Sequence, residues 1–599
     1  MVKETQHHFL RIHSSLGDDA LVLESLNACE GLSRLFDIWV IFTANERIED
    51  MKPLIGEPVS VSLVLGDNAS EPERFFHGHF LSVRELGKPL HNGEGQRYQA
   101  QIVPRAWSAT SRTNCRIFQD QTALDIVETI LGEHSVSLKK KLNNALYTYR
   151  YCVQYGETDW EFVCRVLAHE GLAFFFEHTS SSHTLVITDN EKAYARAAEA
   201  EVVFSSRPRG EARISNWYCS ARATSNAIVE HGYDFTRPAE KVDEKSQETV
   251  PGDPFGEREL FDYIGEDRPL KDKAGLAGRH LQAVTQENEM REGQSDYRSF
   301  GAGLVFSFSA HEDGLPSPNE FLITEVRIQA SVPLDSDNQP GGARFNYSNT
   351  FRCMPLDRPF VPVKIAKPVM PGLQTATVTC APGEEIHVDE HGRIKVQFHW
   401  DREGKSNQHS SCWIRVAQSW AGENWGAQFI PREGQEVLVE FVNGDPDQPL
   451  ITGAVYNGKN KMPYEPMSEK NTSGIKSRST TKGNGANYNE ISFDDTLGNE
   501  WLRIHAEKDH ELTVENDQTD DVGNNRQGTI GNNDTLKVGN DQKISVGKTI
   551  TVDAGTSITF KTGAASLTME SSGNISIKGT SISVQGTTIA LKAAKISLN

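Results

Sequence analysis

The histidines and carboxylates of residues 384–399 are of the types that bind metal ions. His387 and His391 are four residues apart, His399 follows, and the nearby carboxylates are Glu384, Glu385 and Asp389. A zinc site requires such side chains to converge on one point. The surrounding residues predict strands joined by a turn, which places His387 and His391 on opposite sides of the Asp389–Glu390 corner. We therefore predict no metal ligands here or elsewhere.

Other residues could suggest catalysis, but their spacing argues against it. The carboxylate pairs are adjacent in sequence: Asp18–Asp19, Asp494–Asp495 and Asp520–Asp521. Adjacent residues of a strand point to opposite faces, whereas a glycosidase needs two carboxylates facing one bond. The His169–Glu170 pair lacks the second histidine of a metalloprotease motif, and no nucleophile elbow, P-loop or Rossmann glycine triplet occurs. The sequence predicts no catalytic residue, no cofactor-binding residue and no enzyme activity.

Composition narrows the possible partners. The 599 residues include 61 Lys and Arg against 82 Asp and Glu, a net charge of −21. This charge repels phosphate, which argues against nucleic acid as a partner, and the length indicates several domains. No apolar run approaches the ~18 residues of a membrane span, and the first residues lack the apolar core of a signal peptide. We expect the chain to start in the cytoplasm and to leave the cell without an N-terminal signal.

Residues 1–365 predict a mostly β-structured head with two helices. The first helix spans about Ala123 to Leu131, with Thr122 as its N-cap and Gly132 as its stop. The second follows Thr158, which forms a capping box with Glu161, and ends at Gly171. An apolar strand at 172–176, a turn at 180–182 and a second strand at 185–187 then predict a hairpin beside this helix.

A second unit, residues 366–458, predicts a small barrel. A run of prolines marks the boundary before it: Pro355, Pro359, Pro362, Pro368 and Pro371. About five short strands follow in about eighty residues, among them Ile394–Phe398, Trp413–Val416 and Glu436–Phe441. This density of strands is typical of an OB-type barrel. Residues 459–510 are predicted to be a connector.

Residues 511–599 contain a repeat of eight residues. Glycines recur at this spacing: Gly523, Gly531, Gly539, Gly547, Gly555 and Gly563. With 48 glycines in 599 residues, five further glycines at one fixed spacing have a chance of roughly a few in a million. Each octad predicts a short strand with alternate apolar residues inward and a glycine corner where φ is positive. A valine at Gly539 or Gly547 would then be strained.

The repeat shortens toward the end of the chain. There the apolar pairs recur every seven residues: Ile575/Ile577, Ile582/Val584, Ile589/Leu591 and Ile596/Leu598. The repeat predicts a β-helix needle over residues 511–599. Three chains wound round one axis and a single chain coiled with three octads per turn would both show this period.

Three groups of residues together resemble one known family. The head segment Gln154–Trp160 with Glu170–Gly171, the barrel segment Asp389–Phe398 with Trp400–Asp401, and the Val-Gly octads occur in that family's order. The chain is thus similar over its whole length to the valine-glycine repeat protein G (VgrG) spikes of bacterial type VI secretion systems. Phage tail hub and needle proteins are related to them.

The resemblance implies a mainly β fold: a β-rich α+β head like a phage tail hub, an OB-fold neck and a triple-stranded β-helix. It implies a homotrimer seated on hexameric tube rings, in contact with baseplate proteins and driven outward by sheath contraction. It also implies a PAAR-repeat tip protein and effectors at the C-terminal end, and transient contact with the target membrane. The expected function is membrane puncture and effector delivery, from the bacterial cytoplasm into a target cell.

The C-terminal end of the needle is the expected docking surface. An unfinished β-helix exposes unpaired strand edges, which a capping partner would cover. The residues expected to dock the tip partner are Ile589, Leu591, Ile596, Leu598 and Asn599. Two alternatives remain open from the sequence: the spike of a contractile phage tail or phage-derived particle, and a glycan-degrading tailspike enzyme. The narrow octads offer little groove for the enzyme.

Overall fold

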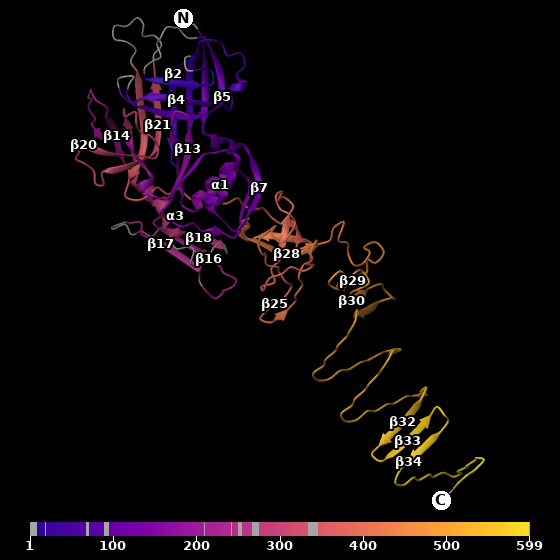
Figure 1. The fold of residues 1–599 in the computed structure, drawn as a ribbon. Coiled ribbons are helices and arrows are strands. Elements are labelled where there is room, and N and C mark those ends of the chain that lie inside the picture. The colour runs from indigo at the N-terminus through magenta and orange to yellow at the C-terminus, as the bar shows by residue number, and fades with distance from the viewer. Residues whose placement is uncertain are drawn as a thin grey trace. The chain divides into compact units, whose positions relative to one another are not determined.

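The chain divides into two units, residues 1–509 and 510–599, shown from indigo to yellow in Figure 1. The computed structural model describes residues 9–17, 20–66, 71–88, 95–208, 210–240, 242–248, 254–265, 275–332 and 345–597.

The head is built on a twelve-stranded sheet. Its strands in spatial order are β1 (Leu10–Ser14), β4 (Pro58–Val64), β5 (Glu73–Gly87), β6 (Gln96–Val103), β3 (Asp37–Ala44), β2 (Leu21–Gly31), β21 (Glu320–Ser331), β20 (Leu304–His311), β14 (Ala195–Phe204), β15 (Ile214–Cys219), β19 (Arg291–Ser295) and β22 (Asn346–Pro355). β22 also pairs with β21, so the last six strands close into a barrel. Alternate side chains fill the interior, as in β3, where Ile38, Val40 and Phe42 are fully buried.

A layer of two helices and seven short strands, called the helical layer below, packs beside this sheet (Figure 1). It comprises β7 (Thr113–Phe118), β8 (Gln121–Thr122), α1 (Ala123–Glu133), β9 (Leu138–Lys141), β10 (Thr148–Tyr149), β11 (Cys152–Thr158), α2 (Asp159–His169), β12 (Ala173–His178) and β13 (His183–Thr188). Both predicted caps are confirmed, since Thr122 and Thr158 each form a capping box. The β12–β13 hairpin is confirmed too. α1 continues past Gly132, so that glycine is not its stop; His134 is the C-cap.

A small subdomain of the head was not predicted from the sequence. It consists of β16 (Ala227–Gly232), β17 (Val242–Gln247), β18 (Glu259–Gly265) and α3 (Leu276–Thr285). The three strands form one sheet in the order β17-β16-β18. His280 of α3 connects it to the helical layer, because its Nδ1 lies 2.8 Å from Glu230 and its Nε2 lies 3.0 Å from the carbonyl oxygen of His169.

The neck is a closed barrel, as predicted. β23 (Gln374–Thr379), β24 (Lys395–Phe398), β27 (Glu436–Phe441) and β28 (Pro449–Val455) pair in the order β24-β23-β27-β28. The predicted strand at 413–416 makes only two isolated bridges, Ile394 to Ile414 and Val416 to Ile451, which connect the two edges. Tyr151 and Val153 of the head lie in the barrel's core. Head and neck therefore share one hydrophobic core.

The predicted connector contains a folded sheet. β29 (Thr472–Lys476), β30 (Glu490–Asp494) and β31 (Trp501–His505) pair antiparallel. Glu385 of the neck holds this sheet in place: it accepts hydrogen bonds from the Arg478 side chain and, at 3.2 Å, from the Lys482 backbone N–H. The Arg478 guanidinium accordingly lowers the pKa of Glu385. The loop between β29 and β30 is therefore attached to the barrel.

The C-terminal unit has little pairing of its own. Residues 510–556, all within the described part of the chain, contain no strand, although each octad was predicted to be one. Strands need partner strands, and in this segment one copy of the chain supplies none. Farther on, β32 (Ser557–Thr562), β33 (Ala565–Glu570) and β34 (Ile575–Lys578) form an antiparallel meander.

A buried ion network stabilises the family-like segment Gln154–Trp160. The Asp159 carboxylate is fully buried at the first turn of α2. Its hydrogen-bond donors are Arg112, Arg116, His134 and Gln154. Burial alone would raise the pKa of Asp159, but the hydrogen bonds from His134, Gln154 and Arg112 and the charge of Arg116 outweigh it, and the pKa is lowered. The segment is structural, because it anchors α2 to β7 and β11.

We expect Asp159→Asn to destabilise the protein by about 3–5 kcal/mol, because it leaves the Arg116 guanidinium buried without its counter-charge. The matched control is Glu133→Gln, which contacts the same arginine at 2.9 Å but is 39 % exposed and should cost about 1 kcal/mol or less. Because the folded pKa of Asp159 is depressed, its contribution is present above about pH 4 and is lost as the pH falls through the folded pKa. Denaturant unfolding of the two variants checks this; equal losses would contradict it.

Candidate functional site

The connector sheet exposes an apolar face. Ile475, Ile491 and Ile504 lie opposite one another across β29, β30 and β31, and Phe493 lies opposite Leu502. These five side chains are 44 to 62 % exposed. The alternate residues Glu490 and Ser492 of β30 are buried against the rest of the chain. A sheet that buries its polar side chains and exposes its isoleucines needs a partner on the apolar face.

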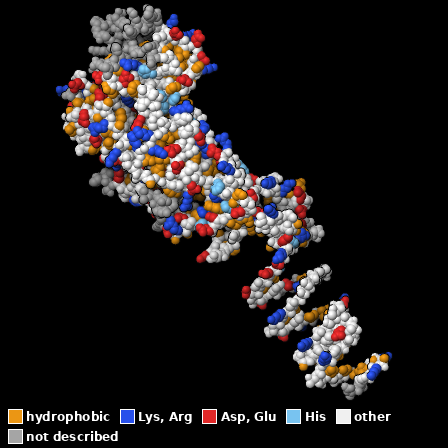
Figure 2. All heavy atoms as spheres, viewed as in Figure 1, with side chains coloured by type: hydrophobic (Ala, Val, Ile, Leu, Met, Phe, Trp, Pro, Cys, Tyr) orange, Lys and Arg blue, Asp and Glu red, His pale blue; other side chains and the backbone are white. Residues whose placement is uncertain are grey.

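The octads expose the same kind of surface. Their apolar side chains are 44 to 71 % exposed: Val522, Ile530, Leu536, Val538, Ile544, Val546, Ile550, Val552 and Phe560. Figure 2 shows hydrophobic side chains on the surface of this unit. Full burial of a valine, leucine or isoleucine side chain is worth about 1.5–3 kcal/mol. Residues that recur at one spacing and find no core in their own chain indicate a core shared between chains.

The octad glycines lie at bends, but their backbone differs from the prediction. The chain bends at each of the six, from Gly523 to Gly563. Only Gly563, in the turn between β32 and β33, has a positive φ, of 52°. At Gly523, Gly531, Gly539, Gly547 and Gly555 the expected positive φ is wrong, and a Cβ there would meet no atom of this chain within 4 Å. An open bend can turn the chain with ordinary dihedral angles, so strain does not require glycine there.

The predicted docking residues are exposed where the structure describes them. Ile589 is 51 %, Leu591 66 % and Ile596 49 % exposed. Leu598 and Asn599 lie outside the described residues. The exposure of these side chains is compatible with a docking surface for a tip protein, which stays a prediction.

The histidines whose spacing resembles that of metal ligands make other contacts in the neck. His387 stacks on Trp413, with ring centroids 4.9 Å apart, and its Nδ1 lies 2.6 Å from Glu384. Asp389 accepts hydrogen bonds from the backbone N–H groups of His391 and Arg393 and so closes the predicted turn. Among the residues that the structure describes, no group of three or more His, Cys, Asp or Glu side chains could hold a metal ion.

The predicted carboxylate pairs have structural surroundings. Asp494 accepts hydrogen bonds from the Thr496 backbone N–H at 2.9 Å and from the Thr472 hydroxyl at 3.0 Å. Asp520 and Asp521 lie on the exposed octads, and Asp18–Asp19 lies outside the described residues. Within the described residues, no helix is long and apolar enough to cross a membrane.

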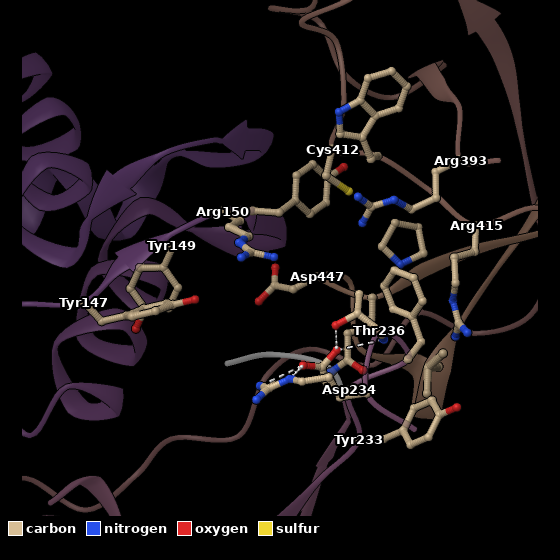
Figure 3. A pocket seen from close by; sticks show the side chains of 17 residues that line it. Tyr147, Tyr149, Arg150, Tyr233, Asp234, Thr236, Arg393, Cys412, Arg415 and Asp447 are labelled. Carbon is tan, nitrogen blue, oxygen red and sulfur yellow. Dashed lines mark hydrogen bonds and ion pairs between the residues drawn. The ribbon is translucent and has the colours of Figure 1, made fainter. Parts of the chain in front are cut away.

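A cavity lies at the joint between the neck and the head (Figure 3). Its volume is about 390 Å³, and head and neck both contribute side chains, among them Tyr149, Asp234 and Asp447. Phe235, in the loop after β16, lies between two neck arginines, with the guanidinium carbons of Arg393 and Arg415 at 5.3 and 4.9 Å from its ring centroid. These cation–π contacts help to fix the head on the neck.

The head also contains a buried histidine cluster that the sequence analysis missed. The backbone N–H of Arg105 donates to Nε2 of His183, so the proton of that ring lies on Nδ1 and is shared with Nδ1 of His77 at 2.9 Å. The backbone N–H of His77 donates in turn to Nδ1 of His178 at 3.1 Å. All three rings are neutral in this arrangement. No local motif predicts it, since His77 and His183 are 106 residues apart.

Burial lowers the pKa of each of these rings, and neighbouring histidines add to the shift in His77 and His183. The pKa of His77 falls to about 4, and the pKa values of His178 and His183 to about 3. A proton added to Nδ1 of His77 would place two donors against each other in the hydrogen bond with His183. A proton added to Nε2 of His183 would instead face the backbone N–H of Arg105, which is also a donor.

Comparison with known families matches three successive parts of the chain. The model of the phage tail baseplate hub matches residues 29–334, and that of the type VI secretion system/phage-baseplate injector OB domain matches residues 382–456. The model of the bacteriophage T4 gp5 C-terminal trimerisation domain matches residues 473–584. The last match includes both the connector sheet and the octads.

Individual relatives agree with these matches. The type VI secretion system spike protein VgrG1b of Pseudomonas aeruginosa is 34 % identical over 527 residues, which cover 87 % of this chain and 70 % of that protein. VgrG1a of the same bacterium is 34 % identical over 516 residues, covering 85 % and 78 %. The actin cross-linking toxin VgrG1 of Vibrio cholerae is 33 % identical over 426 residues, which cover 70 % of this chain but 38 % of the toxin.

Two solved structures share the fold. The E. coli c3393 protein, described as a type VI secretion component similar to T4 tail proteins gp27 and gp5, has a TM-score of 0.52 and 20 % identity, covering 74 % of this chain and all of that one. The half-lidded Francisella PdpA–VgrG complex has a TM-score of 0.50 and 10 % identity, covering 83 % and 88 %.

A tail-hub head, an OB-type neck and octads without a core of their own together define a trimeric spike of a contractile injection machine. The chain belongs to the VgrG family of type VI secretion system spike proteins. The family predicted from the sequence is thereby confirmed.

Gly563 provides a test that separates backbone strain from side-chain size. Valine and asparagine are similar in volume, but asparagine tolerates the left-handed region and valine does not. We expect Gly563→Val to be less stable than Gly563→Asn by about 1–2 kcal/mol per chain, because φ is 52° there. At Gly539, where φ is not positive, the same pair should differ by less than about 0.5 kcal/mol. Thermal unfolding of the four variants checks this; equal Val-to-Asn differences at both sites would contradict it.

The histidine cluster should make the head sensitive to acid. A histidine whose folded pKa is lowered contributes stability above pH 6.5 that is lost as the pH falls toward the folded value, here about 3 to 4. Each such ring adds a slope of about 1.4 kcal/mol per pH unit in this window. We expect His183→Gln to remove about one such slope in unfolding measured between about pH 6.5 and 4.5. The control His399→Gln, at a ring that is 56 % exposed, should leave the slope unchanged.

Proposed function

We propose that this chain is the force-transmitting spike of a type VI secretion machine, in which three copies form one needle that punctures the target membrane and carries effectors. The observation that carries the proposal is the unpartnered apolar surface of residues 472–597. It comprises exposed side chains of the connector sheet and of the octads, most of them within the matched trimerisation domain. Three copies facing one axis would bury it.

The trimer would begin at the connector sheet and not at residue 511. The row of Ile475, Ile491 and Ile504 gives each copy a flat apolar face, and three such faces can close a triangular core. Farther along the chain, three copies of each octad would supply the strand neighbours that residues 510–556 lack within one chain. The octad glycines would then be the corners of the shared needle. The helix would resist bending because its backbone groups are paired between copies.

The partners follow from this arrangement. We propose that the head sits on the hexameric tube rings and contacts the baseplate, since the tail-hub match covers it. A PAAR-repeat tip protein would cover the end of the needle at Ile589, Leu591, Ile596, Leu598 and Asn599. Effectors would travel with the spike, as the PdpA–VgrG complex supports. The spike would pass from the bacterial cytoplasm into the medium or the target cell by sheath contraction.

The chain's role would be mechanical and not catalytic. The carboxylate and histidine candidates are held in turns, stacks and ion pairs of the fold. The toxin relative is much longer than the part that matches this chain, which fits a carrier to which some relatives add a further domain. The shared head–neck core and the Asp159 network would transmit the push from the head to the needle.

A pair of variants in one octad tests the proposal. Ile544→Asp places a carboxylate in each of three apolar surfaces that would share a core, which costs several kcal/mol per trimer. We expect wild type to have the mass of three chains by light scattering and Ile544→Asp to have the mass of one. The matched control is Ser545→Asp, which adds the same charge on the alternate side of the strand and should stay trimeric.

The same variants connect assembly with function. In the producing bacterium, Ile544→Asp should abolish release of the spike and tube proteins into the medium and killing of neighbouring cells, whereas Ser545→Asp should retain both. A monomeric wild type would overturn the proposal, as would a trimeric, secreted Ile544→Asp.

A further inference from the structure

The neck carries an exposed aromatic hairpin that the described contacts of one chain leave uncovered. β25 (Ala421–Gly422) and β26 (Trp425–Gly426) form a short hairpin on the barrel (Figure 1). Trp420 is 65 %, Trp425 57 % and Phe429 59 % exposed. Tryptophan and phenylalanine at this density mark an interaction surface, because exposed aromatic clusters are costly in water.

The hairpin is preorganised for contact. The Trp420 and Trp425 rings lie edge to face with centroids 5.0 Å apart. Asn424 adopts φ of 60°, and a Cβ at Gly422 would lie 2.3 Å from the Trp425 ring. The base is also held, since the Phe429 backbone N–H donates to the Gln418 side chain at 2.9 Å. A loop with fixed aromatic side chains loses little conformational entropy on binding.

The surface is nearly free of charge. Residues 417–429 contain a single charged residue, Glu423, in a chain of net charge −21. Copies of such a chain repel one another, so surfaces that meet near a three-fold axis must have few charges. An uncharged aromatic surface therefore fits a second copy of this chain.

The position of the hairpin relative to the trimer supports the same partner. Glu385 holds the connector sheet directly on the barrel, and that sheet lies in the matched trimerisation domain. In a trimer formed through that sheet, the three barrels would be held close to one another. Exposed apolar residues continue from the barrel toward the sheet, with Val455 37 % and Tyr456 57 % exposed.

We infer that the hairpin of residues 420–429 packs against the neck barrel of the neighbouring copy, so that the trimer interface extends from the connector sheet into the neck. This inference rests on the proposed trimer. Three aromatic side chains of this exposure would bury roughly 300–400 Å² on each copy. That area is too small to assemble the trimer alone but is enough to fix the three barrels against one another.

Hydrogen exchange on the full chain tests the inference. In the wild-type trimer, the amides of residues 418–429 should exchange at least about tenfold more slowly than in monomeric Ile544→Asp, because the neighbouring barrel covers them. Amides of α1, far from the hairpin in sequence and within the head core, should exchange equally in both. Equal exchange of the hairpin in a trimer of verified mass would overturn the inference and leave the spike function intact. A monomeric wild type would overturn both.

Photo-crosslinking identifies what covers the hairpin. Benzoylphenylalanine at Trp425 in trimers mixed from ¹⁴N and ¹⁵N chains should give crosslinks between light and heavy neck peptides. The matched control is the same probe at Leu315, an exposed head position (57 %), which should give no neck crosslinks. Crosslinks from Trp425 only to a different protein, formed in cells and absent from purified trimers, would overturn the inference in favour of an outside partner.

Discussion

The structure depends on one constraint: the apolar side chains of roughly the last 130 residues cannot be buried by a single chain. Ile475, Ile491 and Ile504 form a row on one face of a three-stranded sheet, and the octads repeat the same exposure down to Ile596. A monomer would leave all of this surface in water. In the proposed trimer, assembly round an axis would give this region both its core and its strand pairing.

The head, the neck and the connector sheet are joined to one another by side-chain contacts. Tyr151 and Val153 reach from the head into the barrel core, and Phe235 packs against neck arginines from another part of the head. Glu385 then attaches the barrel to the connector sheet. Each joint combines contacts from segments far apart in sequence. A load applied to the head would therefore pass to the connector sheet through packed side chains and ion pairs.

Local signals made much of this predictable. The capping boxes of Thr122 and Thr158 each depend on only four consecutive residues. The octad glycines recur too many times for their spacing to arise by chance. Features that combine segments far apart in the chain could not be predicted from local sequence signals. The connector sheet pairs strands separated by turns of polar residues, and the histidine cluster joins residues 106 positions apart. The barrel closes through single bridges at Ile414 and Val416. The sequence of this segment does not distinguish two isolated bridges from a full strand.

The eight-residue spacing of the octad glycines needs an explanation other than a positive φ. A positive φ would explain glycine from within one chain, but Gly539 and Gly547 lack it, and a Cβ there would meet nothing in that chain. An alanine would therefore be acceptable to the isolated chain at both positions. A requirement that the isolated chain does not impose must come from its surroundings in the assembly. The eight-residue spacing of glycine is best explained as the absence of a side chain where neighbouring copies approach most closely, while Gly563 alone combines this with a backbone need.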